Sequence, residues 1–252
     1  MQAPGSEDDS PGQGNLQKDG EDEEEAEGPQ DGDQADGEPF FSFDQDQPGQ
    51  EEGKGGGEKT YPAHGQGIEK HDPRGLQGQG LNYATAPIGA SHCRAHMGYP
   101  EMVGIPKPID PHETKGKGKL VKFWHEVFSI IDSAGLCIFF AARNLVRPEL
   151  EIYPDRILDY LNAVTGAEYS MEELMKAGER TLNAERLFLV RAGFSRKDDT
   201  LPRRLTHELH TSGPSAGRVV RLEEMKDEYY RERGWDENGI PTDRKLKELG
   251  LK

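Results

Sequence analysis

Cysteine is scarce in this chain of 252 residues, which contains only Cys93 and Cys137. Two thiols cannot complete a metal site alone, so any such site needs ligands from elsewhere. The chain also lacks a charged-then-apolar leader at its start and any apolar run long enough to cross a membrane. We therefore expect a cytoplasmic protein whose cysteines are reduced.

Positive charge is scarce in the first quarter of the chain, where residues 1–65 contain 19 Asp and Glu against 3 Lys. The remaining residues are balanced, with 28 acidic and 28 basic side chains. The first segment also holds 13 of the 31 glycines and almost no aliphatic residues. It cannot bury enough apolar surface to offset the entropy lost on ordering. We therefore expect residues 1–65 to be a disordered, acidic, low-complexity segment.

Two interpretations of this acidic segment remain open. It is a solubilising or partner-binding tail, as long blocks of like charge often are, or it is an unevolved or misassigned start of the coding region. Both interpretations argue against nucleic acid as a partner. The rest of the chain is neutral, and the acidic segment would repel phosphates.

Residues 66–252 contain no long alternation of apolar and polar residues of the kind that predicts a β-strand. Residues 218–222 are the exception, since they could form a short paired strand. Residues 66–119 are rich in glycine and proline, which indicates loops around short helical pieces. Apolar residues spaced by three and four then predict an amphipathic helix from Leu120 to about Ser133–Gly135. The ordered part is therefore expected to be mainly α.

Four further helices are predicted after this one. They begin near Pro154, Ser170, Leu222 and Thr242, and the first three end at Gly166, Gly193 and Gly234. The longest opens with a capping box in which Ser170 and Glu173 satisfy each other's backbone amides. Its Gly178 should allow close contact with a neighbouring helix. Its expected inward residues are Leu174, Ala177, Thr181, Ala184, Leu187 and Phe188.

One apolar segment carries polar residues that a core helix does not need. Asp132 and Cys137 interrupt the run over residues 128–144. An ionised carboxylate out of water is costly unless it is paired or hydrogen-bonded, so a polar or metallic partner is expected. Gly135 should leave backbone N–H groups free to donate to a sulfur or a phosphate oxygen. A buried structural cysteine at a helix end is the alternative interpretation.

Together with the loop GASHCRAH at residues 89–96, the turn DSAGLC resembles the carboxy-terminal domains of the aldehyde ferredoxin oxidoreductases. The resemblance covers residues 66–252 and rests also on DPRG, GLNYAT, DYLNAVTG, GERTLNAERLFLVRAGFSRKDDTLPRR and DEYYRERGWDENGIPT. It implies the multi-helical fold of domains 2 and 3 of that family. These enzymes use a tungsten or molybdenum bis-pyranopterin to oxidise aldehydes to carboxylates, and they pass electrons through a [4Fe-4S] cluster to ferredoxin.

The resemblance also implies roles for particular residues. In the family, the Asp of the D-x-x-G-x-C turn hydrogen-bonds a pterin, and the Cys is the fourth cluster ligand. Asp132 and Leu136 are therefore the implied cofactor-binding residues of the turn, and Cys137 is the implied metal ligand. The family's histidine near the metal falls in the loop that matches GASHCRAH. His92 is its best candidate, and Arg94 is implied to lie near the pterin or its phosphates.

The remaining polar and aromatic residues have simpler interpretations. Cys93 is expected to be a semi-buried filler, and residues 196–199 are expected to form a solvated turn that ties helices together by ion pairs, although a functional role for this turn stays open. The histidines expected at the surface or satisfied in the core are His96, His112 and His125. The aromatic residues expected in the core are Phe123, Trp124 and Phe128.

The chain departs from the family before residue 66, because the amino-terminal β-rich domain, its C-x-x-C-x-x-x-C run and its D-x-x-G-L turn are not found. One thiolate should not hold a [4Fe-4S] cluster alone. One hypothesis is therefore that this chain is the carboxy-terminal part of a split or truncated enzyme. It would work with an amino-terminal chain or domain and with ferredoxin, and a homodimer is one assembly it could form. The other is a non-catalytic helical remnant or partner-binding protein. Helices that pack on an absent domain would expose an apolar face.

Overall fold

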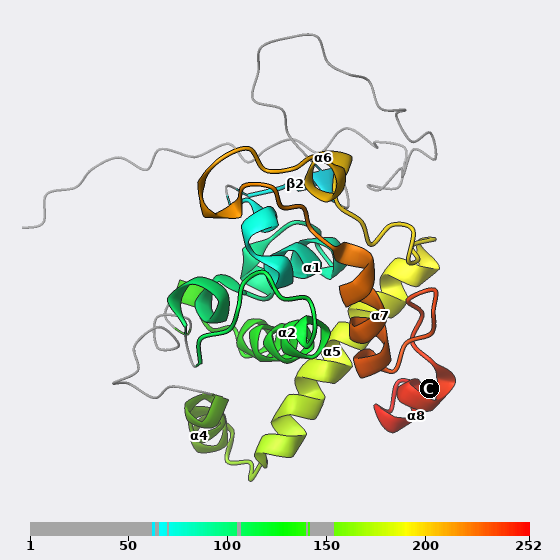
Figure 1. Ribbon diagram of the computed structural model, residues 1–252. Helices are drawn as coiled ribbons and strands as arrows, with labels where there is room; N and C mark the ends of the chain where they lie inside the picture. The colour runs from blue at the N-terminus through cyan, green and yellow to red at the C-terminus, as the bar shows by residue number, and fades with distance from the viewer. Residues whose placement is uncertain (1–61, 64–65, 70, 105–106, 140, 142–153) are drawn as a thin grey trace, which may run out of the picture. The chain divides into compact units, whose positions relative to one another are not determined.

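The computed structural model describes residues 62–63, 66–69, 71–104, 107–139, 141 and 154–252, all within one compact unit that spans Gly56–Lys252 (Figure 1). The acidic segment expected over residues 1–65 lies outside the described residues except at 62–63 and so stays a prediction. The helices are α1 (Gln77–Thr85), α2 (Lys117–Ser133), α4 (Pro154–Thr165), α5 (Met171–Arg191), α6 (Arg203–His207), α7 (Leu222–Arg233) and α8 (Asp243–Glu248).

Short elements fill the intervals between these helices. The 3-10 turns are η1 (Pro73–Gly75), η2 (His92–Arg94) and η5 (Gly213–Ser215), and η3 (Tyr99–Val103) is a π-helical turn. Strands β1 (Pro62–Ala63) and β2 (Gln66–Gly67) pair antiparallel. The described residues are therefore mainly α, as predicted, and residues 218–222 form no strand there. Within the described part, no helix combines the length and apolarity needed to span a membrane.

Helix α2 is the centre of the bundle and packs on α1, α5 and α7 (Figure 1). It begins at Lys117, three residues before the predicted start. The extension is possible because Glu228, from α7, accepts hydrogen bonds from the backbone N–H groups of Gly116 and Gly118, both at 3.0 Å. A carboxylate distant in sequence thus caps a helix that lacks its own capping side chain.

Two glycines let the neighbouring helices approach α2 at backbone distance. A Cβ atom on Gly118 would lie 2.5 Å from the backbone nitrogen of Tyr229 in α7. A Cβ atom on Gly178 of α5 would lie 2.6 Å from the carbonyl oxygen of Glu126 in α2. The predicted role of Gly178 is confirmed, and α2 is contacted closely by a different helix at each of these two points.

The predicted inward face of α5 was partly wrong. Leu174 is buried as expected, but Ala184 is exposed and Phe188 is 69% exposed. Asn183 and Arg186 are buried further along the helix. They can be buried because each has partners: Asn183 Oδ1 accepts from the indole N–H of Trp235 at 2.8 Å, and Arg186 forms a two-bond ion pair.

The turn over residues 196–199 has two different halves. Arg196 lies near the surface and pairs with Glu223 and Asp227 of α7, as the ion-pair interpretation predicts. Asp199 is instead completely buried, where both of its oxygens accept from Arg186 at 2.7 Å. The Tyr230 hydroxyl also donates to Asp199, and burial together with the nearby carboxylate raises the pKa of that hydroxyl. The solvated-turn prediction therefore fails at Asp199.

The buried carboxylate of Glu101 links three elements. It accepts from the backbone N–H groups of Gly78 at 2.8 Å and Gln79 at 3.1 Å, which are orphan donors at the start of α1. It also accepts from Lys117 Nζ, at the start of α2, at 2.5 Å. Burial raises the pKa of Glu101, while Lys117 and the two amides act in the opposite direction. One side chain from η3 thus holds the starts of α1 and α2 together.

Replacement of this carboxylate tests its importance for the fold. Glu101→Gln should lower the free energy of unfolding by about 3 kcal/mol, because the Lys117 charge stays buried without its counterion. Denaturant unfolding measures the loss. As a matched control, Asp159→Asn removes one member of the exposed Arg156–Asp159 pair and should change stability little. Equal small effects from both variants would contradict the linking role.

The close approach at Gly178 gives a second stability test. Alanine is normally the better residue inside a helix. Gly178→Ala should nevertheless destabilise the protein by about 1–3 kcal/mol, because the new methyl group meets the Glu126 carbonyl and the Ile130 side chain. Thermal unfolding of this variant should be compared with that of Lys176→Ala, an exposed change in the same helix. A Gly178→Ala protein as stable as the control would refute the backbone contact.

Candidate functional site

The loop at residues 89–96 is held in place by amide side chains of α1. Asn82 Nδ2 donates to the carbonyl of Ser91 at 3.0 Å, and Gln79 Oε1 accepts from the N–H of Met97 at 3.0 Å. The Ser91 hydroxyl accepts from the N–H of Cys93 at 3.1 Å, which caps η2. The loop is therefore fixed at both ends against a fully buried helix.

Arg94 joins the two motifs that the sequence singles out. Its Nη1 atom donates to Asp132 Oδ2 at 2.6 Å, at the end of α2. Its Nη2 atom donates to both oxygens of Glu185 in α5, at 2.7 Å and 2.6 Å. The Arg94 side chain is 11% exposed, and that of Asp132 is 43% exposed. Asp132 has the polar partner that was expected, but it is not a buried carboxylate.

The turn after α2 is a Schellman motif, in which a left-handed glycine ends the helix. Gly135 has φ of +67°, and its N–H donates to the Asp132 carbonyl at 3.0 Å. The N–H of Leu136 donates to the Ile131 carbonyl at 3.1 Å. The expectation that Gly135 leaves backbone N–H groups free is therefore wrong for these two amides, because the helix end uses them.

The last two residues of this turn differ in their exposure to solvent. Leu136 is half-buried and packs against the hydrophobic core. Cys137 is exposed and carries a free thiol. The alternative of a buried structural cysteine is therefore wrong, and the thiol is accessible to a ligand from outside the described residues.

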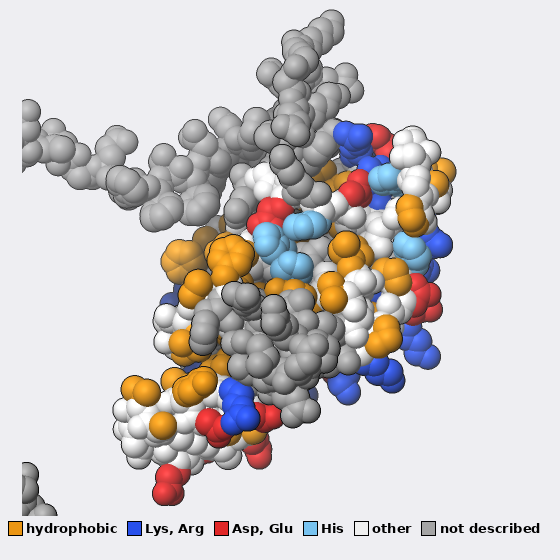
Figure 2. Space-filling model, turned by 90° about the vertical axis from the view of Figure 1, so that its left-hand side faces the viewer, with side chains coloured by type: hydrophobic (Ala, Val, Ile, Leu, Met, Phe, Trp, Pro, Cys, Tyr) orange, Lys and Arg blue, Asp and Glu red, His pale blue; other side chains and the backbone are white. Residues whose placement is uncertain are grey.

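Histidines gather around the third predicted site residue. His92 contacts Glu69 twice: its backbone N–H donates to Oε2 at 3.0 Å, and its ring Nδ1 lies against the same oxygen. The ring centre of His92 lies 5.2 Å from that of His71 and 4.8 Å from that of His96. The His96 ring also stacks on Tyr99. Figure 2 shows a face on which histidine side chains gather beside acidic ones.

Burial favours the neutral rings of His92 and His96. It lowers the pKa of His92 below its ordinary value. It also lowers the pKa of His96 to about 4, with smaller contributions from the positive charges of His92 and His71. A neutral imidazole can accept a proton or ligate a metal ion, so the group suits either chemistry.

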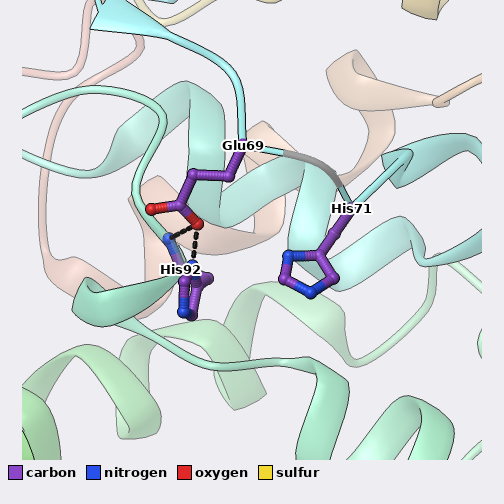
Figure 3. Close-up of side chains that lie close together, drawn as sticks. All are labelled: Glu69, His71 and His92. Carbon is purple, nitrogen blue, oxygen red and sulfur yellow. Dashed lines mark hydrogen bonds and ion pairs between the residues drawn. The ribbon is translucent and has the colours of Figure 1, made fainter.

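Glu69 and His71 were missed from the sequence. Glu69, His71 and His92 each offer a ligand atom, and these atoms all lie within 4.8 Å of one another (Figure 3). The available signal was a carboxylate and an imidazole two residues apart, immediately before DPRG. That spacing becomes meaningful only when the loop that carries His92 folds back onto it.

His125 is a satisfied core histidine, as predicted. Its ring nitrogens lie 2.9 Å from the Tyr229 hydroxyl and 2.9 Å from Asn82 Oδ1. Cys93 is half-buried, and Trp124 and Phe128 belong to the core, as expected. The prediction was wrong for Phe123, which is 36% exposed.

The chain matches a family model described as aldehyde ferredoxin oxidoreductase, domains 2 and 3, over residues 50–251. Tungsten-containing aldehyde ferredoxin oxidoreductases are similar to it. The relative from Pyrococcus abyssi is 44% identical over 188 residues, which are 74% of this chain and 30% of the relative. The one from Pyrococcus furiosus is 42% identical over 186 residues, or 73% of this chain and 29% of the relative.

Two further similarities extend the comparison. An aliphatic sulfonate oxidoreductase, WOR-like subunit, from Pyrococcus furiosus is 34% identical over 134 residues, which are 50% of this chain and 20% of that protein. The solved active-site complex BamBC of benzoyl coenzyme A reductase, in complex with 1,5-dienoyl-CoA, is 19% identical, with a TM-score of 0.51. The match covers 73% of this chain and 31% of that one, and it supports the fold alone.

These matches define an oxidoreductase-family helical region. The chain belongs to the aldehyde ferredoxin oxidoreductase family and corresponds to its domains 2 and 3. The resemblance inferred from the sequence motifs is thereby confirmed, as is the multi-helical fold. The chain spans less than a third of the length of the curated relatives above.

The buried His125 gives a prediction for pH dependence. Burial, with the charges of Arg233 and Arg94, lowers the pKa of His125 well below its usual value. The unfolded chain binds a proton there near pH 6.5, whereas the folded chain does so only at lower pH. The unfolding free energy should therefore fall with decreasing pH below about 6.5, with a contribution of up to about 1.4 kcal/mol per pH unit.

The comparison of two histidine variants isolates this contribution. His125→Gln should show a flatter decline of unfolding free energy between about pH 6.5 and 4.5. His207→Gln, which changes an exposed histidine in α6, should keep the slope of the unmodified protein. Urea unfolding at several pH values measures both slopes. An unchanged slope in His125→Gln would exclude His125 as the source.

Proposed function

We propose that this chain is the carboxy-terminal part of a tungsten or molybdenum pterin oxidoreductase that oxidises aldehydes to carboxylates, with ferredoxin as electron acceptor. The observation that carries the proposal is the ion pair between Arg94 and Asp132. It joins the loop of His92 to the D-x-x-G-x-C turn, the two segments to which the resemblance assigns cofactor contacts. Relatives named tungsten-containing aldehyde ferredoxin oxidoreductases support the same function.

The donor groups fit the expected cofactors. Arg94 holds Asp132 through Oδ2, and the exposure of this carboxylate leaves it accessible to pterin N–H donors. The exposed thiol of Cys137 suits ligation of an iron atom. When bound, the pterin-held metal and the cluster supply the two-electron and one-electron redox chemistry.

The residues of this chain would position groups and handle protons. Arg94 is itself anchored by Glu185 of α5, so it fixes the carboxylate of Asp132 relative to the helix bundle. The imidazole of His92 lies against the carboxylate of Glu69, and its proposed role is to accept a proton during aldehyde oxidation. Leu136 would contribute packing beneath the turn rather than a polar contact.

The proposal requires a second cofactor-binding part. Cys137 provides one thiolate, whereas a [4Fe-4S] cluster needs four ligands. An amino-terminal cofactor domain, in the same longer protein or in a partner chain, would provide the others. Ferredoxin is the proposed electron acceptor, a homodimer is one proposed assembly, and the cytoplasm is the expected compartment.

Metal analysis of the protein from its own source tests this function. The protein should be purified without oxygen, and tungsten, molybdenum and iron should be measured together with any polypeptide that co-elutes. Tungsten or molybdenum with iron, in a species that contains an amino-terminal cofactor region, would support the oxidoreductase. A protein free of these metals and of such a region would instead favour a helical remnant or a partner-binding protein.

The role of Cys137 can be tested in the assembled protein. Cys137→Ser should lower the iron content and the electron paramagnetic resonance signal of the cluster, because a hydroxyl is a poor replacement for the thiolate. Cys93→Ser is the matched control, since it changes the other, half-buried thiol. An iron content unchanged by Cys137→Ser, or lowered equally by both variants, would contradict the assignment.

A further inference from the structure

Three potential metal ligands meet on one side of the loop at residues 89–96. Glu69 follows β2, His71 precedes η1, and His92 begins η2. Figure 3 shows the carboxylate of Glu69 directed at His92 and the ring of His71 turned toward the same space. One ligand atom from each residue lies within 4.8 Å of the other two.

We propose that Glu69, His71 and His92 bind a divalent transition-metal ion of the zinc class. Two imidazoles and one carboxylate form a donor set typical of Zn²⁺ and of similar first-row ions. Metal–ligand bonds of about 2.0–2.2 Å place neighbouring ligand atoms roughly 3–3.5 Å apart. The three side chains therefore need only small movements to close on an ion.

Two of the three ligands are already fixed relative to each other. Glu69 Oε2 accepts from the backbone N–H of His92 at 3.0 Å and contacts the His92 ring. Glu69 Oε1 accepts from the Ser91 hydroxyl at 3.4 Å. These contacts keep the carboxylate beside the imidazole before any ion arrives, which lowers the ordering cost of binding.

The third ligand has freedom to close the site. His71 is exposed, so its ring can adjust without disturbing the core. The neighbouring Asp72 side chain is held in place, because it accepts from Arg74 Nε at 3.0 Å and from Arg74 Nη2 at 2.5 Å, and Arg74 Nη1 in turn donates to the carbonyl of Glu208 at 3.1 Å. The site thus combines a fixed carboxylate–imidazole pair with an adjustable second imidazole.

Three protein ligands leave at least one coordination position for water or a small ligand, as in catalytic zinc sites. His92 is shared with the proposed function, and a metal ion bound to its ring would replace its role as a proton acceptor. The contacts proposed for the pterin and the cluster, at Asp132 and Cys137, are not needed for this site. Binding of the bare metal ion to the pterin-free chain therefore tests it separately.

Titration of the full chain with Zn²⁺ tests the site. After treatment with a chelator, isothermal titration calorimetry should show one ion bound per chain. His71→Ala and Glu69→Gln should each weaken binding by tenfold or more, because each removes one of three ligands. The matched control His207→Ala removes an exposed histidine of α6 and should bind Zn²⁺ like the unmodified chain.

Substitution with Co²⁺ identifies the ligand atoms. The absorption spectrum should show bands of a nitrogen–oxygen site without thiolate charge-transfer bands, and His71→Ala should abolish them. Circular dichroism checks that the variants fold, which is expected because His71 is exposed. The proposal is overturned by absent Zn²⁺ binding, by His71→Ala binding as tightly as the unmodified chain, by thiolate bands, or by an equal loss in the control.

Discussion

The carboxylate of Glu101 is the interaction on which the arrangement of the site depends. It satisfies two amides at the start of α1 and neutralises Lys117 at the start of α2, so it sets how these two helices begin relative to each other. Helix α1 carries the amide side chains that hold the histidine loop, and α2 ends at the Asp132 turn. The buried charge of Glu101 therefore fixes the positions of the loop at residues 89–96 and the turn at residues 132–137 relative to each other.

The same solution recurs across the bundle, where buried charges are paired between elements. Arg233 of α7 pairs with Glu126 of α2 at 3.1 Å, and Arg186 of α5 pairs with Asp199. A buried pair of this kind adds less net stability than its Coulomb energy implies, because both charges lose their hydration. Separation of the partners in a different helix arrangement would leave a buried charge unpaired, which is strongly destabilising.

Local sequence signals predicted α2, α4, α5, α7 and α8 well but gave no individual helix for α1 or α6. Glycine and proline marked their ends, and the capping box of Ser170 and Glu173 is present as expected. Such features depend on residues only a few positions apart, so the sequence displays them directly. The start of α2 escaped prediction because its capping group, Glu228, lies more than a hundred residues away.

The site was harder to predict for the same reason. The motif resemblance selected His92, Arg94 and Asp132, and the structure brings Arg94 and Asp132 into contact. Periodicity misplaced the buried face of α5, because it counts apolar side chains and cannot anticipate that Asn183 and Arg186 find partners inside. Glu69 and His71 gained a possible role only from the fold, which returns the loop of His92 to them.

The two glycine contacts along α2 have a mechanical consequence. Because Gly118 and Gly178 let main chain touch main chain, the spacing of α7 and α5 from α2 is set by backbone thickness and not by side-chain volume. Changes in size among the surrounding apolar residues can then be absorbed locally, without a shift of the helix axes. Glu185 lies two turns beyond Gly178, so such changes do not alter its distance from the end of α2. Arg94 can therefore bridge the carboxylates of Asp132 and Glu185 at constant length.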